Sequence, residues 1–428
     1  MDNRVTRRGV MKGGLALASG AAAASVFGPS TKAWAAGKLE IFSWWTSGGE
    51  AAALETLTSA YLKTFPGTEL INATVAGGGG SNALPVLQAR LSGGNPPDSW
   101  QTISGRALLD TYADPGFAED ITDLYESEGW IDKIPPAVLD LVRKNGRYYG
   151  VNTGAHRSNE VWFNKKLLAK NGIEIGDTLS FDQFFAAAEK LKTAGVNALA
   201  VGDNGIWANQ RMFENTFNGV LGYDQTQKLW KGELAFNAPE MKEAMKIHLR
   251  MLEFQNPDHS ALSWDQAVGK VINGTSAFNM MGDWAYGEFV KAGAKDGVDF
   301  GWVSHPGTDD IFIIVTDCFT VAKGAPNAVE ARNWLRAIGS AEAQLAFSLK
   351  KGAVAPRLDI DKSKLPPYLQ WSYHKFATNK FTGSSVNGEQ VPASFVQAST
   401  DALTSFVVTK NVDRFADALK AAQDATKS

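Results

Sequence analysis

The chain has 428 residues and a formal net charge of −3, from 42 basic and 45 acidic residues. A single domain rarely grows beyond about 250–300 residues, so this length predicts two lobes. The near-neutral charge argues against nucleic acid as a partner, because phosphate binding needs a basic surplus. The single cysteine, Cys318, excludes an intramolecular disulfide and a cluster of thiolate metal ligands. The 13 tryptophans favour a function that needs flat, amphipathic surfaces.

The N-terminal segment has the features of an export signal. Arg7 and Arg8 form a twin-arginine pattern. A weakly apolar run follows over 13–27, and Ala33-Trp34-Ala35 supplies a small-x-small cleavage site. The apolar run is shorter than the roughly 20 residues that span a membrane. We therefore expect export to the periplasm with cleavage near Ala35, and no direct membrane insertion.

Strands and helices alternate along the rest of the chain. Alternating polarity predicts a first strand over 38–44, and apolar residues at helical spacing predict a helix over 50–64. Further strands are expected at 70–75, 99–103, 148–151, 161–165, 276–281 and 311–321, and further helices at 84–91, 181–194, 240–254 and 264–273. The segment 327–349 is expected to hold two helices with a break near 339–340, and the stretch 394–426 to be largely helical. Ser180 is the expected N-cap of the helix over 181–194. This alternation is typical of an α/β protein with a parallel sheet.

Signatures of several enzyme and cofactor classes are missing from the sequence. Gly77–Gly80 lacks the Lys-Ser/Thr pair of a phosphate-binding loop, so we interpret it as a flexible turn. The first strand is not followed by the Gly-x-Gly-x-x-Gly fingerprint of dinucleotide binding. The five histidines do not form the spaced pair of a zinc-protease helix. Cys318 lies in an apolar run and is expected to be an inert core residue. We therefore expect neither a cofactor nor a metal.

Paired carboxylates keep one enzymatic alternative open. Glycoside hydrolases need two carboxyl groups about 5–10 Å apart, one of them with a raised pKa. The candidates are Glu50, Asp98, Asp283 and Asp317. Their positions in the sequence do not exclude such a pair.

Tryptophans repeatedly stand beside acid or amide side chains. The clusters are Trp44-Trp45 with Glu50, Trp100-Gln101, Trp264-Asp265 and Asp283-Trp284, while Asp317 and Lys351 are isolated polar residues beside apolar runs. An indole can cover the apolar C–H face of a pyranose. Carboxylates and lysines bind its hydroxyl groups with charge-assisted strength. The Trp44-Trp45 pair also ends the first strand, where open α/β sheets bind ligands. The pattern favours a sugar-binding cleft.

A series of short motifs carries a resemblance to one protein family. The motifs are Phe42-Ser43-Trp44-Trp45, Asn95-Pro96-Pro97-Asp98, Tyr149-Gly150-Val151, His156-Arg157, Val161-Trp162-Phe163-Asn164-Lys165, Met280–Trp284 and Gly352–Arg357. In this order and spacing, residues 38–428 resemble the extracellular (periplasmic) solute-binding proteins of bacterial ABC sugar importers, in the maltose/glucose-binding-protein-like family. The Trp44-Trp45 start is most similar to the glucose/mannose-binding branch.

The resemblance implies an α/β, two-lobed periplasmic-binding-protein fold similar to type II. After a signal peptide at 1–35, the N-terminal lobe would comprise residues 36–150 and 312–366. The C-terminal lobe would comprise residues 151–311 and 367–428. A sugar would bind in the cleft between the lobes and shift a hinge equilibrium toward the closed form.

The resemblance also assigns ligand contacts by position. The expected contacts are the aromatic residues Trp44, Trp45, Trp264 and Trp284, and the polar residues Glu50, Gln101, Asp283, Asp317, Lys351 and Asn387. Two positions depart from the glucose-binding pattern, because Ile103 and Asn387 stand where such relatives tend to have histidines. A ligand other than plain glucose therefore stays open.

The resulting expectation is a monomeric periplasmic binding protein without catalysis or cofactor. It would bind a monosaccharide, glucose or a similar hexose, and deliver it to the transmembrane subunits of an ABC permease. The alternatives are a glycoside hydrolase and a protein that binds a disaccharide or another polyol.

Overall fold

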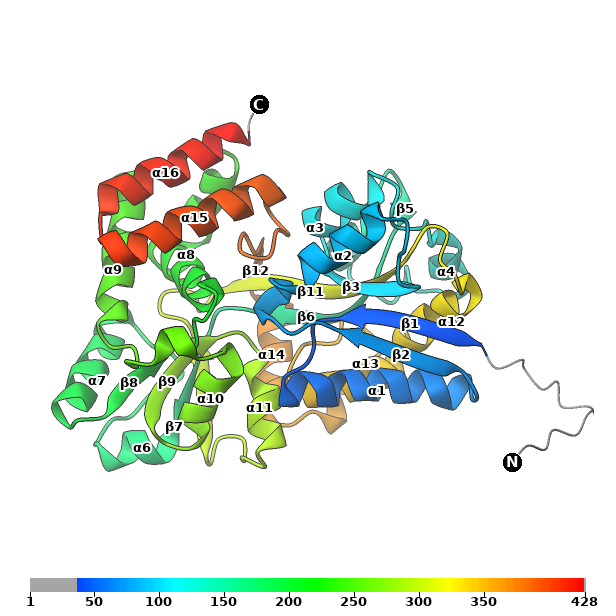
Figure 1. Cartoon of the computed structure of the whole chain (residues 1–428). Helices are drawn as coiled ribbons and strands as arrows, with labels where there is room; N and C mark the ends of the chain where they lie inside the picture. Colours follow the sequence, from blue (N-terminus) through cyan, green and yellow to red (C-terminus); the bar gives the residue numbers. More distant parts are fainter. Residues whose placement is uncertain (1–36, 427–428) are drawn as a thin grey trace, which may run out of the picture. The chain divides into compact units, whose positions relative to one another are not determined.

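The computed structural model describes residues 37–426, which form two large mixed β-sheets, one small two-stranded sheet and the helices around them (Figure 1). The expected signal peptide, its twin arginines and its cleavage site lie outside the described residues. Among the described helices, none combines the length and the apolar composition that crossing a membrane requires.

One strand is much longer than the others and links the two halves of the molecule. This strand is β11 (Ile311–Val321), which is buried throughout. The remaining strands are β1 (Lys38–Ser43), β2 (Glu69–Thr74), β3 (Ser99–Ile103), β4 (Arg143–Lys144), β5 (Arg147–Tyr148), β6 (Val151–Arg157), β7 (Glu160–Asn164), β8 (Asn197–Ala200), β9 (Ser276–Met281), β10 (Phe300–Ser304) and β12 (Lys380–Gly383).

The helices lie on both sides of the sheets and vary widely in length. They are α1 (Gly48–Thr64), α2 (Ala83–Ser92), α3 (Arg106–Leu108), α4 (Thr122–Ser127), α5 (Pro136–Asp140), α6 (Lys165–Lys170), α7 (Phe181–Thr193), α8 (Trp207–Trp230), α9 (Pro239–Leu252), α10 (Trp264–Ile272), α11 (Ala285–Lys291), α12 (Ala328–Ile338), α13 (Ala341–Lys351), α14 (Pro367–Thr378), α15 (Ala393–Thr409) and α16 (Val412–Ala425). Short turns are η1 (Gly78–Gly80), η2 (Leu109–Ala113), η3 (His259–Ala261) and η4 (Lys362–Lys364).

Most of the elements expected from the sequence are confirmed to within a few residues. The strands predicted at 99–103, 276–281 and 311–321 have the predicted bounds. Ser180 caps α7 as expected, because its hydroxyl accepts from the Gln183 backbone and the Gln183 side chain accepts from the Ser180 backbone.

The expectation of a parallel sheet is wrong for both sheets. In the first sheet, of order β12-β11-β3-β1-β2, β1 is parallel to β2 and β3, whereas β11 is antiparallel to β3 and to β6. The reason is the path of the chain. β11 begins at the end of the sheet where β1 and β3 finish, so it runs in the opposite direction to them. In the second sheet, of order β10-β7-β9-β8, only β8 and β9 are parallel.

The long helix α8 has no counterpart in the sequence prediction. It buries polar side chains, among them Asn209, Arg211 and Glu214, so its apolar residues do not mark a single face. Gly222 interrupts its helical geometry with φ +69°. With α9, α15 and α16 it encloses a separate aromatic core that includes Phe213 and Phe415.

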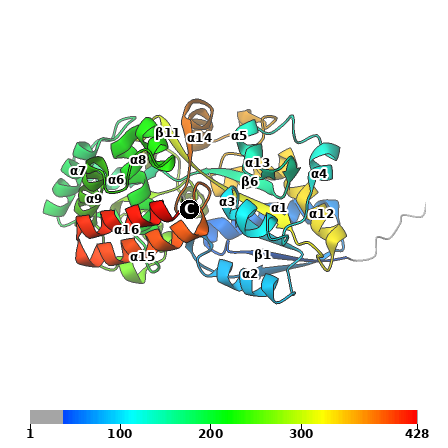
Figure 2. The same cartoon turned by 90° about the horizontal axis from the view of Figure 1, so that it is seen from above.

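The chain passes between the two sheets in β6, in β11 and between α13 and α14. In the view from above, β11 and α14 lie between the helices of the first lobe, such as α1 and α12, and those of the second lobe, such as α8 and α9 (Figure 2). By pairing, β6 and β12 both belong to the first sheet, through β11. The expected lobe boundaries at 150/151, 311/312 and 366/367 fall in or beside these connections, and they stay a prediction.

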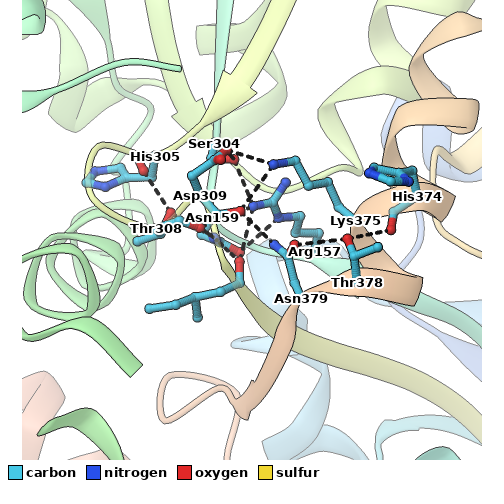
Figure 3. A network of polar contacts seen from close by, with 11 residues as sticks. Arg157, Asn159, Ser304, His305, Thr308, Asp309, His374, Lys375, Thr378 and Asn379 are labelled. Carbon is cyan, nitrogen blue, oxygen red and sulfur yellow. Dashed lines mark hydrogen bonds and ion pairs between the residues drawn. The ribbon is translucent and has the colours of Figure 1, made fainter. Parts of the chain in front are cut away.

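A buried arginine holds these connections together (Figure 3). Arg157, at the end of β6, donates from Nη2 to Ser304 Oγ at 3.0 Å and to the Ile311 carbonyl at 3.1 Å. The guanidinium lies 4.9 Å from the ring of Trp371 on α14. Lys375 reaches the same cluster from α14 through Asp309 at 2.7 Å. One planar cation thus joins β6, β10, β11 and α14, which fixes where the connections leave the second lobe.

Candidate ligand-binding site

A small cavity lies where β1 and β3 end, and we call it the inner cavity. It has a volume of about 30 Å³. Its lining residues are Trp44, Trp45, Glu50, Gly79, Ile103, Trp207, Trp264, Trp284, Val315, Asp317, Lys351 and Asn387. These residues come from at least eight separate segments of the chain, so only the tertiary structure brings them together.

Most of the residues expected from the sequence meet at this cavity. The lining includes Trp44, Trp45, Glu50, Trp264, Trp284, Asp317, Lys351 and Asn387. Gln101 and Asp283 do not line it; both are fully buried behind the wall. Both were expected at the cavity surface, but in this structure they support the side chains that form the wall. Direct contact of the others with a ligand stays a prediction.

Gln101 orients the residues in front of it. Its Nε2 donates to Asp317 Oδ1 at 2.7 Å, and its Oε1 accepts from Ser43 Oγ at 2.6 Å and from the Trp44 backbone at 3.3 Å. The amide therefore ties the end of β1 to β11. It fixes the direction of the Asp317 carboxylate at the cavity wall.

Asp283 has a comparable role in the second lobe. Its Oδ2 accepts from the Arg157 backbone at 2.9 Å, and the Asp283 backbone donates to the Arg157 carbonyl at 2.9 Å. Its Oδ1 lies 2.5 Å from His156 Nδ1. These contacts anchor the turn that carries Trp284 into the cavity.

Two acidic side chains at the cavity each lie beside a basic side chain. Glu50 accepts from Lys351 Nζ at 2.7 Å, and His156 Nε2 lies 3.1 Å from Asp317 Oδ2. Burial raises the pKa of Glu50, although the charge of Lys351 opposes this shift. The wall thus offers paired charges rather than isolated ones.

Several buried polar atoms at the cavity have no protein partner among the described residues. They are the indole Nε1 atoms of Trp207 and Trp284 and the Oδ1 atom of Asn387. Within residues 37–426, two donors and one acceptor beside the cavity therefore have no hydrogen-bond partner. Leaving such groups unpaired costs about 1–3 kcal/mol each, which favours a polar ligand at this site.

Flat aromatic faces form much of the enclosure. The rings of Trp207 and Trp284 are 5.6 Å apart at an angle of 40°, and the Arg211 guanidinium lies 5.3 Å and 5.5 Å from them. At Trp44, a Cβ placed on Gly80 would lie 3.0 Å from the nearest ring atom. Gly80 also has φ +80°, so glycine is required there for two reasons.

A larger cavity of about 370 Å³ adjoins the inner one, and we call it the outer cavity. It shares Trp44, Glu50, Trp207 and Trp264 with the inner cavity. The rest of its lining is Thr46, Ser47, Ala76, Gly77, Gly78, Ser81, Asn82, Gly202, Asn204, Gly205, Ala208, Ser263 and Asp265. Many of these are small or polar, so the outer cavity offers hydrogen-bonding groups with fewer aromatic faces.

Sequence analysis did not single out Trp207, Gly79, Val315 or His156 as site residues. Trp207 begins α8, whose buried polar side chains hide the helical pattern. Gly79 lies in the run that we interpreted as a flexible turn, yet a Cβ at Gly79 would meet Trp207 Nε1 at 2.6 Å. The excess of tryptophan was the one signal that could have pointed to Trp207.

The structure divides the four carboxylates considered for hydrolysis into two that line the inner cavity and two that do not. Asp98 lies away from the cavity and accepts from the backbones of Glu40 at 2.8 Å and Asn327 at 2.6 Å, which is a structural role. Glu50 and Asp317 are the candidates that line the inner cavity. In residues 37–426, no group of three or more acidic, histidine or cysteine side chains is placed to hold a metal ion.

Two α/β lobes with a polar, tryptophan-lined cavity define a ligand-binding protein of the two-lobed class. Residues 44–345 match the family model of bacterial extracellular solute-binding proteins, and the chain belongs to this family. Because the family is extracellular, the protein acts outside the cytoplasm.

Individual relatives and solved structures agree with this assignment. The chain is 34% identical to an uncharacterized ABC transporter extracellular-binding protein of Pyrococcus horikoshii, over 90% of this chain and 87% of that protein. It is 32% identical to a probable sugar-binding periplasmic protein of Rhizobium meliloti, over 90% of this chain and 92% of that protein. A solute receptor with a preference for β-D-galactopyranose has the same fold, with a TM-score of 0.79, 20% identity, and coverage of 92% of this chain and 99% of the receptor. A chitin oligosaccharide binding protein also matches, with a TM-score of 0.79, 16% identity, and coverage of 91% and 99%.

Proposed function

We propose that this protein is the sugar-binding component of a bacterial ABC importer and holds one hexose ring, glucose or a similar monosaccharide, in the inner cavity. The observation that carries the proposal is the pairing of tryptophan faces with unmatched polar atoms. Trp207 and Trp284 offer both an aromatic face and a free N–H donor, and Asp317 and Glu50 supply acceptors beside them. A pyranose needs this combination of apolar and hydrogen-bonding surfaces.

Binding of a hexose requires the lobes to separate first. A volume of about 30 Å³ holds roughly two or three water molecules. Opening at β6, β11 and the segment between α13 and α14 would admit the ring, and closure would bring both walls onto it. The two departures from the glucose-binding pattern support a shifted preference, because Ile103 and Asn387 both line the cavity.

Calorimetry with glucose, mannose, galactose, xylose and a set of disaccharides tests the proposal. We expect one hexose to bind with 1:1 stoichiometry, and Asp317→Asn to weaken it about tenfold or more. The matched control is Asp401→Asn, which removes an exposed carboxylate on α15. Binding of no sugar would contradict the ligand class, and release of products from aryl glycosides would favour the hydrolase.

A disaccharide is the second candidate ligand. The outer cavity adjoins the inner one through Trp44, Glu50, Trp207 and Trp264, so it could hold a second ring next to the first. Tighter binding of a disaccharide than of either component sugar would favour this candidate.

We further propose a periplasmic monomer that docks on the transmembrane subunits of its permease without a catalytic step. The twin arginines Arg7 and Arg8 support export by the corresponding pathway. Replacing both by lysine should leave the precursor in the cytoplasm, which cell fractionation would detect. Processing near Ala35 can be checked by N-terminal analysis of the exported protein, and its monomeric state by size-exclusion chromatography with light scattering.

A further inference from the structure

His156 lies between two carboxylates that belong to different parts of the fold. Its Nδ1 is 2.5 Å from Asp283 Oδ1, in the turn after β9, and its Nε2 is 3.1 Å from Asp317 Oδ2, on β11. The imidazole itself is on β6 and is 1% exposed. The three side chains thus form a continuous link from the wall of the inner cavity to the second lobe.

The charge of the imidazole follows from these two contacts. A neutral imidazole carries one N–H, so its other nitrogen would direct a lone pair at a carboxylate. Only the imidazolium has an N–H on both ring nitrogens and a positive charge that attracts both Asp283 and Asp317. The contact with Asp283 has hydrogen-bond geometry, whereas the contact with Asp317 is an ion pair without hydrogen-bond alignment.

The other charged groups around His156 do not outweigh the stabilisation of its protonated form by Asp283 and Asp317. Glu160 on β7 adds a further negative charge nearby, and Arg157 follows directly in β6 with its guanidinium turned toward Ser304. On the cavity side, the next charged groups beyond Asp317 are Glu50 and Lys351, which form an ion pair with each other. Burial lowers the pKa of His156, but the charges of Asp283 and Asp317, together with the hydrogen bond to Asp283, outweigh burial and raise this pKa to about 9.

We propose that His156 is a positioning residue of the ligand site, which acts by holding Asp317 against the cavity from one side and the Asp283–Trp284 turn from the other. This inference rests on the proposed function of the inner cavity. Gln101 fixes Oδ1 of Asp317, and His156 fixes Oδ2. Without the imidazolium, Asp317 keeps one of its two anchors and Asp283 loses its side-chain partner. Loss of the imidazolium would therefore misalign both the Asp317 carboxylate at the cavity wall and the turn that carries Trp284.

The first test compares His156→Gln with the wild type in sugar affinity across pH. Glutamine retains an N–H donor but carries no charge. We expect about a tenfold to hundredfold loss of affinity at pH 7 in the variant. We also expect a fall in wild-type affinity above pH 9 that is absent from the variant, since the variant has no imidazolium to lose. Equal affinities at pH 7, or parallel pH profiles, would overturn the inference.

The second test does not depend on sugar binding. Nuclear magnetic resonance of the histidine ring nitrogens, with the His156 signal assigned from the spectrum of the variant, should show a doubly protonated ring at pH 8. A neutral ring at pH 8 overturns the inference, whatever the ligand. Failure of the wild type to bind any sugar, with a charged ring at pH 8, would instead contradict the proposed function. Thermal melting of His156→Gln and His156→Asn separates loss of affinity from loss of the fold, and a folded His156→Asn that binds as the wild type does would also overturn the inference.

Discussion

Lys351 Nζ donates to Glu50 Oε1 at 2.7 Å and joins the last turn of α13 to the first turn of α1. Each charge also lies at the helix end whose dipole favours it, since the carboxylate is near a helix N-terminus and the ammonium near a C-terminus. The Lys351 Nζ further lies 5.4 Å from the centre of the Trp45 ring. One ion pair therefore fixes two helices and an aromatic wall at the inner cavity.

Lys351→Met should destabilise the protein by about 3–5 kcal/mol at pH 8, because it leaves a buried carboxylate without its cation. The loss should be smaller at pH 5. Burial already raises the pKa of Glu50, and removal of Lys351 raises it further, so Glu50 protonates on acidification and no longer needs a partner. Urea denaturation at the two pH values measures the difference.

The matched control for this change is Lys350→Met. Lys350 is exposed one residue earlier in α13, so its loss should alter stability by less than about 0.5 kcal/mol. Equal effects of the two variants would contradict a stabilising role of the Lys351 pair.

His248→Leu should make the protein less sensitive to acid. Burial, with a smaller contribution from His305, lowers the pKa of His248 to about 3, and both of its ring nitrogens lack partners among the described residues. The native state therefore holds this ring neutral, while the unfolded chain protonates it below about pH 6.5. Stability associated with His248 is present above pH 6.5 and falls as the pH drops toward 3.

Thermal melts of the wild type and His248→Leu at pH 7 and pH 4 measure this effect. The variant should lose less stability on acidification. His374→Gln is the control, since His374 is exposed on α14. An identical acid response of wild type and His248→Leu would contradict the prediction.

Trp207→Ala should change the size of the ligand that binds. Trp207 lines both cavities, and the Gly79 backbone lies against its indole. Removing the ring would join the two cavities, so we expect weaker binding of a hexose and a relative gain for disaccharides. Calorimetry with both sugar classes measures the ratio of affinities. A uniform loss for all sugars would indicate that Trp207 is only a stacking surface.

The Cys318 thiol should be inert in the folded protein. Burial raises its pKa to about 12, and the side chain is fully buried in β11. A disulfide-exchange reagent at pH 8 should therefore label the native protein only as fast as it unfolds, and should label it at once in concentrated urea. Rapid labelling of the native protein would place Cys318 in an accessible position.

The order of elements and much of the site could be predicted from the sequence where the pattern is local. The bounds of β3, β9 and β11 and the N-cap at Ser180 follow from runs of a few residues. The buried polar face of α8 broke the rule that core residues are apolar, so this helix and Trp207 were missed. The direction of β11 was missed because it depends on the chain returning from the other lobe.

The sequence alone determined the two-lobed α/β class, the aromatic and acidic residue types of the site, and eight of the side chains that line the inner cavity. Only the tertiary structure decided that Gln101 and Asp283 stand behind the wall, and that His156 joins Asp283 to Asp317. The physical reason is the distance along the chain over which each interaction acts. Propensity, capping and hydrophobic period act over a few residues, whereas hydrogen-bond partners 127 or 216 positions apart are set by how the strands cross between lobes.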